Sequence, residues 1–368
     1  MPDRPSTSAT RLQPALPATY YTDPSILARE WERIFKRSWQ YVGREDRLPE
    51  PGDHLTLEVG DESVLMVRDR DRRLRAFYNV CRHRGSRLCG VEAGRGASSF
   101  QCSYHAWTYG LDGRLAGAPG LKGVEGFRKE DFGLVPVPLE VWRGFVFIRL
   151  QAEGEPLAAQ LGSMPGRVTR YPLEGLKVER RTVQEVGANW KILFENYHEC
   201  YHCPGVHPEL CDLVPLYGTG DVDVNGGGVA ALFRDGVTAL TRSGATRLPA
   251  LSGLNEVERR QFNGEAIRPN MWINFMPHWI QTRVLWPAGP GRTRIVTEWL
   301  YEAATLARPD FDPSEVMDFT MLISEQDWRV CESVQKGIGS RSFTRGVYMP
   351  QEEPLVEFNR WVLERLES

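Results

Sequence analysis

The sequence predicts an α+β protein in which a small all-β domain is inserted into a larger domain with an antiparallel sheet and a long C-terminal helix. Two patterns support this class. Short β-type runs separated by Gly, Asp and Arg clusters fill residues 41–150. A second group of β-type runs at 266–301 is followed by helical periodicity from 314 to 337. With 368 residues, 41% of them hydrophobic, the chain can build two cores.

A change of composition after Gln151 sets the expected domain boundaries. We predict that residues 40–152 form the small β domain, and that residues 1–39 and 153–368 together form the larger domain. The pattern at 22–38 is helical, because its apolar residues recur at intervals of three and four.

Two cysteine–histidine pairs fall on separate turns of the predicted β domain. They read Cys81-x-His83 and Cys102-x2-His105. Thiolate and imidazole together suit zinc, or a [2Fe–2S] cluster with two cysteines on one iron and two histidines on the other. Zinc fingers usually put two cysteines on one turn and two histidines on the other, whereas here each turn supplies one of each. The spacing therefore favours the cluster. Three nearby aromatic residues can shield it: Tyr104, Trp107 and Tyr109.

A second set of metal-binding residues follows the helical pattern at 190–201. Glu199 and His202 are three residues apart, so they share a helix face. The break at Pro204-Gly205 then lets His207 fold back towards His202. Two histidines brought together in this way need one carboxylate to complete the 2-His-1-carboxylate site of non-haem iron(II). The long C-terminal helix offers that carboxylate, and spacing alone leaves three candidates: Glu325, Asp327 and Glu332.

These motifs resemble the large subunit of the Rieske non-haem iron oxygenases. That family carries a Glu-Asn pair, then an acid, then two histidines, and Glu195-Asn196, Glu199, His202 and His207 match the pattern. Aromatic-ring dioxygenases usually have Asp where this chain has Glu199, with one more residue between that acid and the Asn. The motif E-C-x-H-C-P-x-V-H-P is similar to the one found in the branch of the family that acts on quaternary ammonium compounds such as glycine betaine and carnitine.

The resemblance implies the cofactors, the remaining site residues and the partners. It implies a Rieske [2Fe–2S] cluster on Cys81, His83, Cys102 and His105, and a mononuclear Fe(II) whose third ligand is Asp327. It gives catalytic roles to Glu199 and Asn196. The catalytic domain is expected to have a helix-grip-like fold. We also expect a homotrimer in which one subunit's cluster faces its neighbour's iron and electrons pass from His105 through Glu199 to His202.

An enzyme of this kind needs O2, a small-molecule substrate and electrons. No G-x-G-x-x-G follows a strand and no Walker motif occurs, so the electrons are expected from a separate NAD(P)H-dependent reductase. The favoured reaction is hydroxylation and N-demethylation of a glycine betaine-like substrate. Aromatic-ring hydroxylation or O-demethylation is an alternative. A Rieske electron carrier or a zinc-stabilised binding protein is an alternative of another class, and Cys200-x2-Cys203 is a weaker zinc motif.

Charge and composition exclude other classes. The formal net charge of −3 gives no basic field for nucleic acid, and no apolar run approaches the length of about eighteen residues that a membrane span needs. The first seventeen residues lack the basic start and apolar core of a secretory signal. Seven cysteines are an odd number in a large chain, so we expect no disulfide framework and a reducing cytoplasm.

Overall fold

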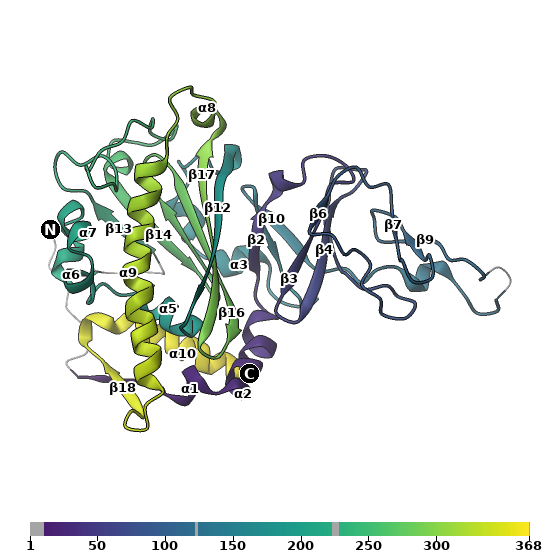
Figure 1. The fold of residues 1–368 in the computed structure, drawn as a ribbon, viewed down its shortest axis with the longest axis horizontal. Helices are drawn as coiled ribbons and strands as arrows, with labels where there is room; N and C mark the ends of the chain where they lie inside the picture. The colour runs from purple at the N-terminus through teal and green to yellow at the C-terminus, as the bar shows by residue number, and fades with distance from the viewer. Residues whose placement is uncertain (1–10, 122–123, 223–227, 368) are drawn as a thin grey trace. The chain divides into compact units, whose positions relative to one another are not determined.

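The computed structural model describes residues 11–121, 124–222 and 228–367. They form two compact units, one spanning Lys36–Leu157 and the other comprising the described residues up to Phe35 together with those from Ala158 onward (Figure 1). The smaller unit consists mainly of short strands, and the larger one combines an extended antiparallel sheet with helices. The predicted α+β class is therefore confirmed.

The smaller unit is built from three antiparallel sheets of short strands, ordered β5-β4-β3-β6, β10-β11-β2 and β7-β8-β9. Their bounds are β2 Gln40–Arg44, β3 His54–Val59, β4 Glu62–Arg68, β5 Leu74–Tyr78, β6 Ala93–Gly94, β7 Phe100–Gln101, β8 Thr108–Tyr109, β9 Leu115–Gly117, β10 Leu139–Trp142 and β11 Phe145–Ile148. The turn between β8 and β9 contains Gly113 at φ +83°. A Cβ atom at Gly113 would lie 2.4 Å from the ring of Phe77, so this turn requires glycine.

The larger unit is organised on a six-stranded antiparallel sheet of order β12-β17-β16-β15-β14-β13. Its strands are β12 Leu176–Val186, β13 Gly228–Leu232, β14 Gln261–Ile267, β15 Met271–Phe275, β16 Ile280–Gly289 and β17 Arg292–Glu302. The central strands are buried along nearly their whole length, as expected for a sheet covered by helices and loops. A separate pair of strands, β1 Gln13–Pro17 and β18 Arg345–Tyr348, joins the two ends of this unit.

The long helix α9, Ser314–Ile338, crosses the sheet of the larger unit (Figure 1). Side chains on the strands hold it there, because Arg283 of β16 donates to Ser324 and Trp299 of β17 donates to Thr320. The remaining α-helices are α1 Thr19–Thr22, α2 Pro24–Glu30, α3 Leu157–Leu161, α4 Met164–Arg167, α5 Trp190–Tyr197, α6 Cys203–Val206, α7 Pro208–Leu213, α8 Ala303–Leu306 and α10 Glu353–Glu367. The helical pattern expected at 22–38 corresponds to α1, α2 and a π-helical turn that ends at Phe35.

The helix expected at 190–201 is shorter than the pattern predicts. Asn189 caps its start by accepting a hydrogen bond from the amide of Lys191, but α5 ends at Tyr197. The amide of His198 bonds back to Glu195 three residues earlier, and the His198 ring bonds the Phe194 carbonyl at 2.6 Å. These contacts tighten the chain into a turn, so Glu199 and His202 do not lie on one helix face.

A fully buried ion pair anchors α5 to α2. The Nζ of Lys191 lies 2.5 Å from a Glu30 carboxylate oxygen, both side chains are 0% exposed, and the indole of Trp190 donates to the other Glu30 oxygen at 2.7 Å. Burial lowers the pKa of Lys191, and the adjacent Glu30 carboxylate opposes that shift. Each charge is therefore stable in the interior only because the other is present.

We expect Lys191→Met to lower the free energy of unfolding by about 3–5 kcal/mol, because it leaves the Glu30 carboxylate buried without its counter-charge. Denaturant unfolding followed by circular dichroism measures this loss. Lys336→Met, an exposed lysine on α9, is the control and should change stability by less than about 0.5 kcal/mol. The double variant Glu30→Gln with Lys191→Met should recover part of the loss, and an unchanged single variant would contradict the account.

Among the described residues, no helix is both long and apolar enough to cross a membrane.

Candidate active site

The two cysteine–histidine turns of the smaller unit share one backbone design. In each turn the cysteine amide donates to the carbonyl five residues later, at 2.8 Å, and the amide four residues later donates back to the cysteine carbonyl, at 3.0 Å. The residue at that fourth position has positive φ in both turns, +73° at Gly85 and +58° at Ala106. Two loops of equal shape therefore present Cys81 and Cys102 in equivalent positions.

The four predicted cluster ligands fall into a buried pair and an exposed pair. Cys81 and Cys102 are each 2% exposed, whereas His83 and His105 are exposed and their ring centroids lie 4.6 Å apart. Burial raises the pKa of the Cys102 thiol, but backbone amides and the Cys81 thiol hydrogen-bond to it and bring the pKa below its usual value. A buried pair of cysteines beside an exposed pair of histidines fits a Rieske cluster, which needs cysteines on one iron and histidines on the other.

The aromatic residues near these turns differ in exposure. Trp107 is buried and stacks on His83 at 4.9 Å, and the buried Tyr109 hydroxyl accepts from the amide of Arg82 at 2.9 Å. Tyr104 packs on the ring of His105 at 3.7 Å but is 54% exposed. Trp107 and Tyr109 are therefore packed against the two loops, whereas Tyr104 is largely exposed.

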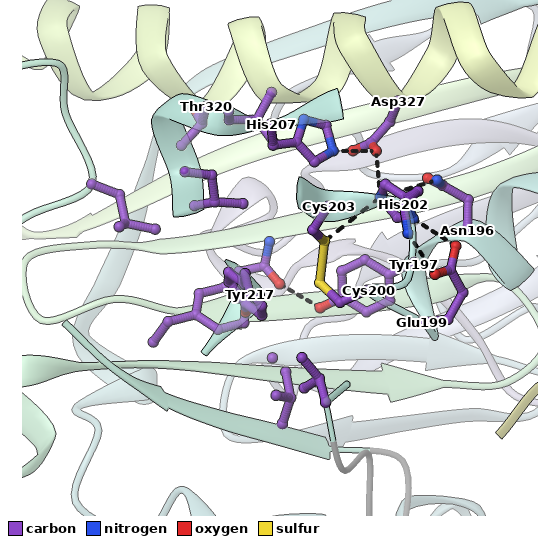
Figure 2. A pocket seen from close by; sticks show the side chains of 18 of the residues that line it. Asn196, Tyr197, Glu199, Cys200, His202, Cys203, His207, Tyr217, Thr320 and Asp327 are labelled. Carbon is purple, nitrogen blue, oxygen red and sulfur yellow. Dashed lines mark hydrogen bonds and ion pairs between the residues drawn. A yellow bond between two sulfur atoms is a disulfide. The ribbon is translucent and has the colours of Figure 1, made fainter. Parts of the chain in front are cut away.

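The second predicted site lies in the larger unit, where three chain segments meet. His202 immediately precedes α6, His207 stands between α6 and α7, and Asp327 projects from α9. One potential ligand atom from each of these residues lies within 4.8 Å of the others. Figure 2 shows the three side chains converging, with His202 between Asp327 on one side and Glu199 on the other.

The outer nitrogens of both histidines are already occupied by protein partners. His202 Nδ1 lies 2.5 Å from Glu199 Oε1, and His207 Nδ1 lies 2.8 Å from Gln326 Oε1. Each ring therefore directs Nε2 inward, where the two Nε2 atoms lie 3.3 and 2.8 Å from Asp327 Oδ1. Metal-ligating histidines are held in this way, by an acceptor on the nitrogen that does not bind the metal. Two nitrogens and one carboxylate on one side of an open space fit a mononuclear iron(II).

The pKa shifts of Asp327 and His202 agree with a role in metal binding. Burial raises the pKa of Asp327, but hydrogen bonds from His202 and His207 outweigh it and lower the pKa to about 2. Burial lowers the pKa of His202, but Asp327 and Glu199 raise it to about 10. The site therefore concentrates negative charge around the two imidazoles, which favours a bound cation.

The other residues considered as ligands or catalytic groups are Asn196, Glu325 and Glu332, and each has a different position or partner. Asn196 Nδ2 lies 3.4 Å from His202 Nε2, at the edge of the ligand group. Glu325 points away and pairs with Arg329, and Glu332 accepts from the amide of Gly187. His198 is buried beside the cavity, its ring bonds the Phe194 carbonyl, and burial lowers its pKa to about 4. Gln326 was not anticipated, because nothing in the sequence marks an amide that reaches back to α6.

Cys200 and Cys203 are joined by a disulfide that lies beside His202, with Cys203 Sγ 3.8 Å from His202 Nε2 (Figure 2). The weaker zinc motif at these positions therefore has no free thiols in this structure. The sequence analysis expected no disulfide framework, and this single short-range bridge was not anticipated. It closes the turn that follows α5, and both sulfurs border the cavity described next.

A cavity of about 130 Å³ opens beside His202, His207 and Asp327. Four aromatic side chains contribute to its wall: Tyr197, Tyr217, Phe262 and Phe319. The large aromatic residues of the central strands are not among its lining residues: Trp272, Phe275, Trp279 and Trp286. Trp272 instead stacks on the outer face of Tyr197 at 4.5 Å, and Phe275 and Trp279 are core.

An open 2-His-1-carboxylate site in one unit and a cluster-binding pair of loops in the other define an iron-dependent oxygenase. Comparison with known families agrees. The Rieske [2Fe-2S] domain matches residues 38–128, and the ring hydroxylating alpha subunit (catalytic domain) matches residues 173–368. The chain belongs to the Rieske non-haem iron oxygenases, as an alpha subunit. It is an oxidoreductase whose family uses a Rieske cluster and a mononuclear iron.

Relatives of known name indicate which branch of the family this chain is similar to. The glycine betaine monooxygenase oxygenase subunit of Chromohalobacter salexigens is 32% identical, over 96% of this chain and 87% of the relative. The carnitine monooxygenase oxygenase subunit of Escherichia coli K12 is 40% identical over 55% of this chain and 54% of the relative. The quaternary ammonium Rieske monooxygenase CntA, solved with L-carnitine, superposes with a TM-score of 0.78 at 28% identity and covers 96% of both chains. Naphthalene 1,2-dioxygenase from Rhodococcus, at 22% identity and a TM-score of 0.74, shares the fold.

Proposed function

We propose that this chain hydroxylates an N-methyl group of a small quaternary ammonium substrate, glycine betaine-like, and thereby demethylates it. One atom of O2 enters a C–H bond of the methyl group. The other leaves as water, after two electrons and two protons have been supplied. The new hydroxymethyl group then departs as formaldehyde, its hydroxyl proton is released, and the nitrogen keeps the electron pair of the broken C–N bond.

The aromatic wall of the cavity carries this proposal. A trimethylammonium group has no N–H donor, so only apolar contact and cation–π attraction can hold it, at roughly 0.5–2 kcal/mol per ring. Tyr217 and Phe262 meet edge to face, with ring centroids 6.1 Å apart, and Phe319 and Tyr197 extend the wall. The cavity has room for roughly ten water-sized groups at 10–15 Å³ each, which suits a small substrate.

Each side chain of the proposed iron site has one task. His202, His207 and Asp327 hold the iron, and iron(II) supplies oxygen activation when bound. Glu199 accepts from His202 Nδ1, so Nε2, which faces Asp327 in this structure, is the nitrogen that would bind the metal once its proton has left. Gln326 does the same for His207. The apolar cavity wall excludes water from the reacting methyl group.

The electrons are proposed to enter through residues 40–152 and to be used in the domain formed by 1–39 and 153–368. A separate NAD(P)H-dependent reductase supplies them to the cluster held by Cys81, His83, Cys102 and His105. In the proposed homotrimer, the exposed His105 of one subunit approaches Glu199 of the next. The description of a related quaternary ammonium Rieske monooxygenase structure, which names inter-subunit electron transfer, supports this arrangement.

Glycine betaine, added to the iron-loaded protein with a surrogate reductase, NADH and O2, should release one formaldehyde per O2 consumed. Colorimetric formaldehyde and an oxygen electrode measure the two sides of this ratio. The protein should be red-brown with about three irons per chain, two in the cluster and one mononuclear. Coupled oxygen uptake with an aromatic acid, and none with quaternary ammonium compounds, would instead make the chain an aromatic-ring hydroxylase or O-demethylase. Stoichiometric zinc without colour would remove the oxygenase assignment.

A further inference from the structure

One arginine lies in the wall of the cavity, on the sheet below the iron-site residues. Arg283 of β16 is 8% exposed, and it is the only lysine or arginine among the described residues that line the cavity. Gln281 lies two residues earlier on the same strand and is 1% exposed. Since alternate residues of a strand share a face, both side chains project from the sheet on the same side.

The hydrogen bonds around this pair leave donors without acceptors. Arg283 gives one N–H to the hydroxyl of Ser324 on α9, but its buried Nε has no partner among the described residues. The amide nitrogen of Gln281 is likewise buried and without a partner there. A buried N–H with no acceptor costs about 1–3 kcal/mol, and more when the donor is charged, so two of them at one cavity wall mark a place for a ligand.

The orientation of Gln281 is set by a chain of hydrogen bonds. The Tyr197 hydroxyl donates to Asn274 Oδ1 at 2.5 Å, and Asn274 Nδ2 donates to Gln281 Oε1 at 3.3 Å. The oxygen of Gln281 is therefore occupied, and its NH2 group is the end that remains. The unpaired groups of Arg283 and Gln281 are both donors, and one belongs to a cation, so the ligand group that matches this pair is an anion with two acceptor oxygens.

The presence of Arg283 is not explained by a need to neutralise the charge of Asp327. Asp327 already accepts from both histidines through Oδ1, and no ion pair joins it to Arg283 among the residues described. Burial lowers the pKa of Arg283, although the negative charge of Asp327 opposes that shift. An arginine keeps its proton even so, and the cavity thus contains a fixed positive charge. A substrate with only a positive charge would be repelled by it.

We propose that Arg283 and Gln281 form a carboxylate subsite, so that the substrate is a zwitterion with a trimethylammonium group at one end and a carboxylate at the other. The inference rests on the proposed function and refines it, because it selects betaines over amino alcohols. The aromatic wall holds the ammonium group, and the Arg283 fork and the Gln281 amide hold the carboxylate.

Glycine betaine and choline make a matched pair of probes, because both carry a trimethylammonium group and only the first ends in a carboxylate. Calorimetric titration of the anaerobic holoenzyme should give the higher affinity for glycine betaine. Arg283→Met should weaken glycine betaine binding about 10- to 100-fold while choline binding is unchanged or becomes tighter. Arg294→Met is the control: this arginine lies on the neighbouring strand β17 and outside the cavity lining, and its loss should change neither affinity.

Should Arg283→Met fail to fold, Gln281→Glu carries the same test. It places a carboxylate beside Arg283, which should abolish glycine betaine binding and leave or strengthen choline binding. Equal losses for both probes, or none, in the Arg283 variant would overturn the subsite, even where wild-type protein converts both compounds. If wild-type protein binds neither quaternary ammonium probe but binds an aromatic carboxylate that Arg283→Met loses, the subsite stands and the proposed substrate class fails.

Discussion

Asp327→Ala should lose its mononuclear iron and its oxygenase activity while it keeps the Rieske cluster. Asp327 supplies the carboxylate of the converging group, in which one ligand atom each of His202, His207 and Asp327 lie within 4.8 Å of one another, and its pKa of about 2 keeps it ionised at neutral pH. Two neutral imidazoles alone hold iron(II) weakly, since the site then supplies no negative charge. We expect iron to fall from about three to about two per chain, and turnover to fall below roughly 1% of wild type.

Metal analysis and the visible spectrum separate the two iron sites in this experiment. The cluster absorbance should be unchanged, because the cluster ligands lie in the other unit of the chain. Asp318→Ala is the control, an exposed aspartate on the same helix α9, and it should keep both iron and activity. Full iron in Asp327→Ala would show that a different carboxylate completes the site, and Glu199 would be the next residue to change.

The parts of the molecule that sequence predicted best are those fixed by short spacings. The two cysteine–histidine loops are local turns, and their spacing already places one thiol and one imidazole on each. Strands such as β4 and β17 were recognised because β-branched and aromatic runs ended at turn residues. The long helix α9 was recognised from its apolar side, which packs on the sheet.

The end of α5 shows where periodicity fails. The apolar pattern continues to Tyr201, yet the helix ends at Tyr197, because the hydrogen bonds of His198 to Phe194 and Glu195 replace the next helical turn. Side chain–backbone bonds of this kind compete with the helix and leave no mark on its period. The contact between Glu199 and His202 survives, but it comes from a turn and not from a helix face.

The cavity was beyond sequence reasoning for a different reason. Its wall combines Tyr217 from a short 3₁₀ turn, Phe262 from β14 and Phe319 from α9, which are brought together only by the tertiary fold. The tryptophans of the central strands are more prominent in the sequence than these three residues, but strand positions that alternate by two direct them into the core or onto neighbouring rings. Gln326 and Arg283 were hidden in the same way, since each acts on a segment far away in the chain.

Glu199→Ala should separate electron transfer from iron binding. Glu199 accepts the Nδ1 proton of His202 at 2.5 Å and is not one of the three converging ligands. Its loss removes the acceptor that orients His202, which lowers metal affinity by about 10- to 100-fold, so iron should still be retained when it is supplied in excess. The cluster should accept electrons normally. Turnover should fall by about 100-fold or more, because the proposed route from a neighbour's His105 to His202 passes through this carboxylate.

Stopped-flow reoxidation of the pre-reduced cluster, with substrate and O2 present, measures this step directly. Glu199→Ala should reoxidise far more slowly than wild type, and Glu199→Gln should lie between them, because its amide keeps the reach but loses the charge. Glu325→Ala, an exposed glutamate on α9, should behave as wild type. Normal reoxidation in Glu199→Ala would eliminate the bridging role. Iron loss as complete as in Asp327→Ala would instead make Glu199 a ligand, since a residue that only orients His202 cannot be needed for the metal to bind at all.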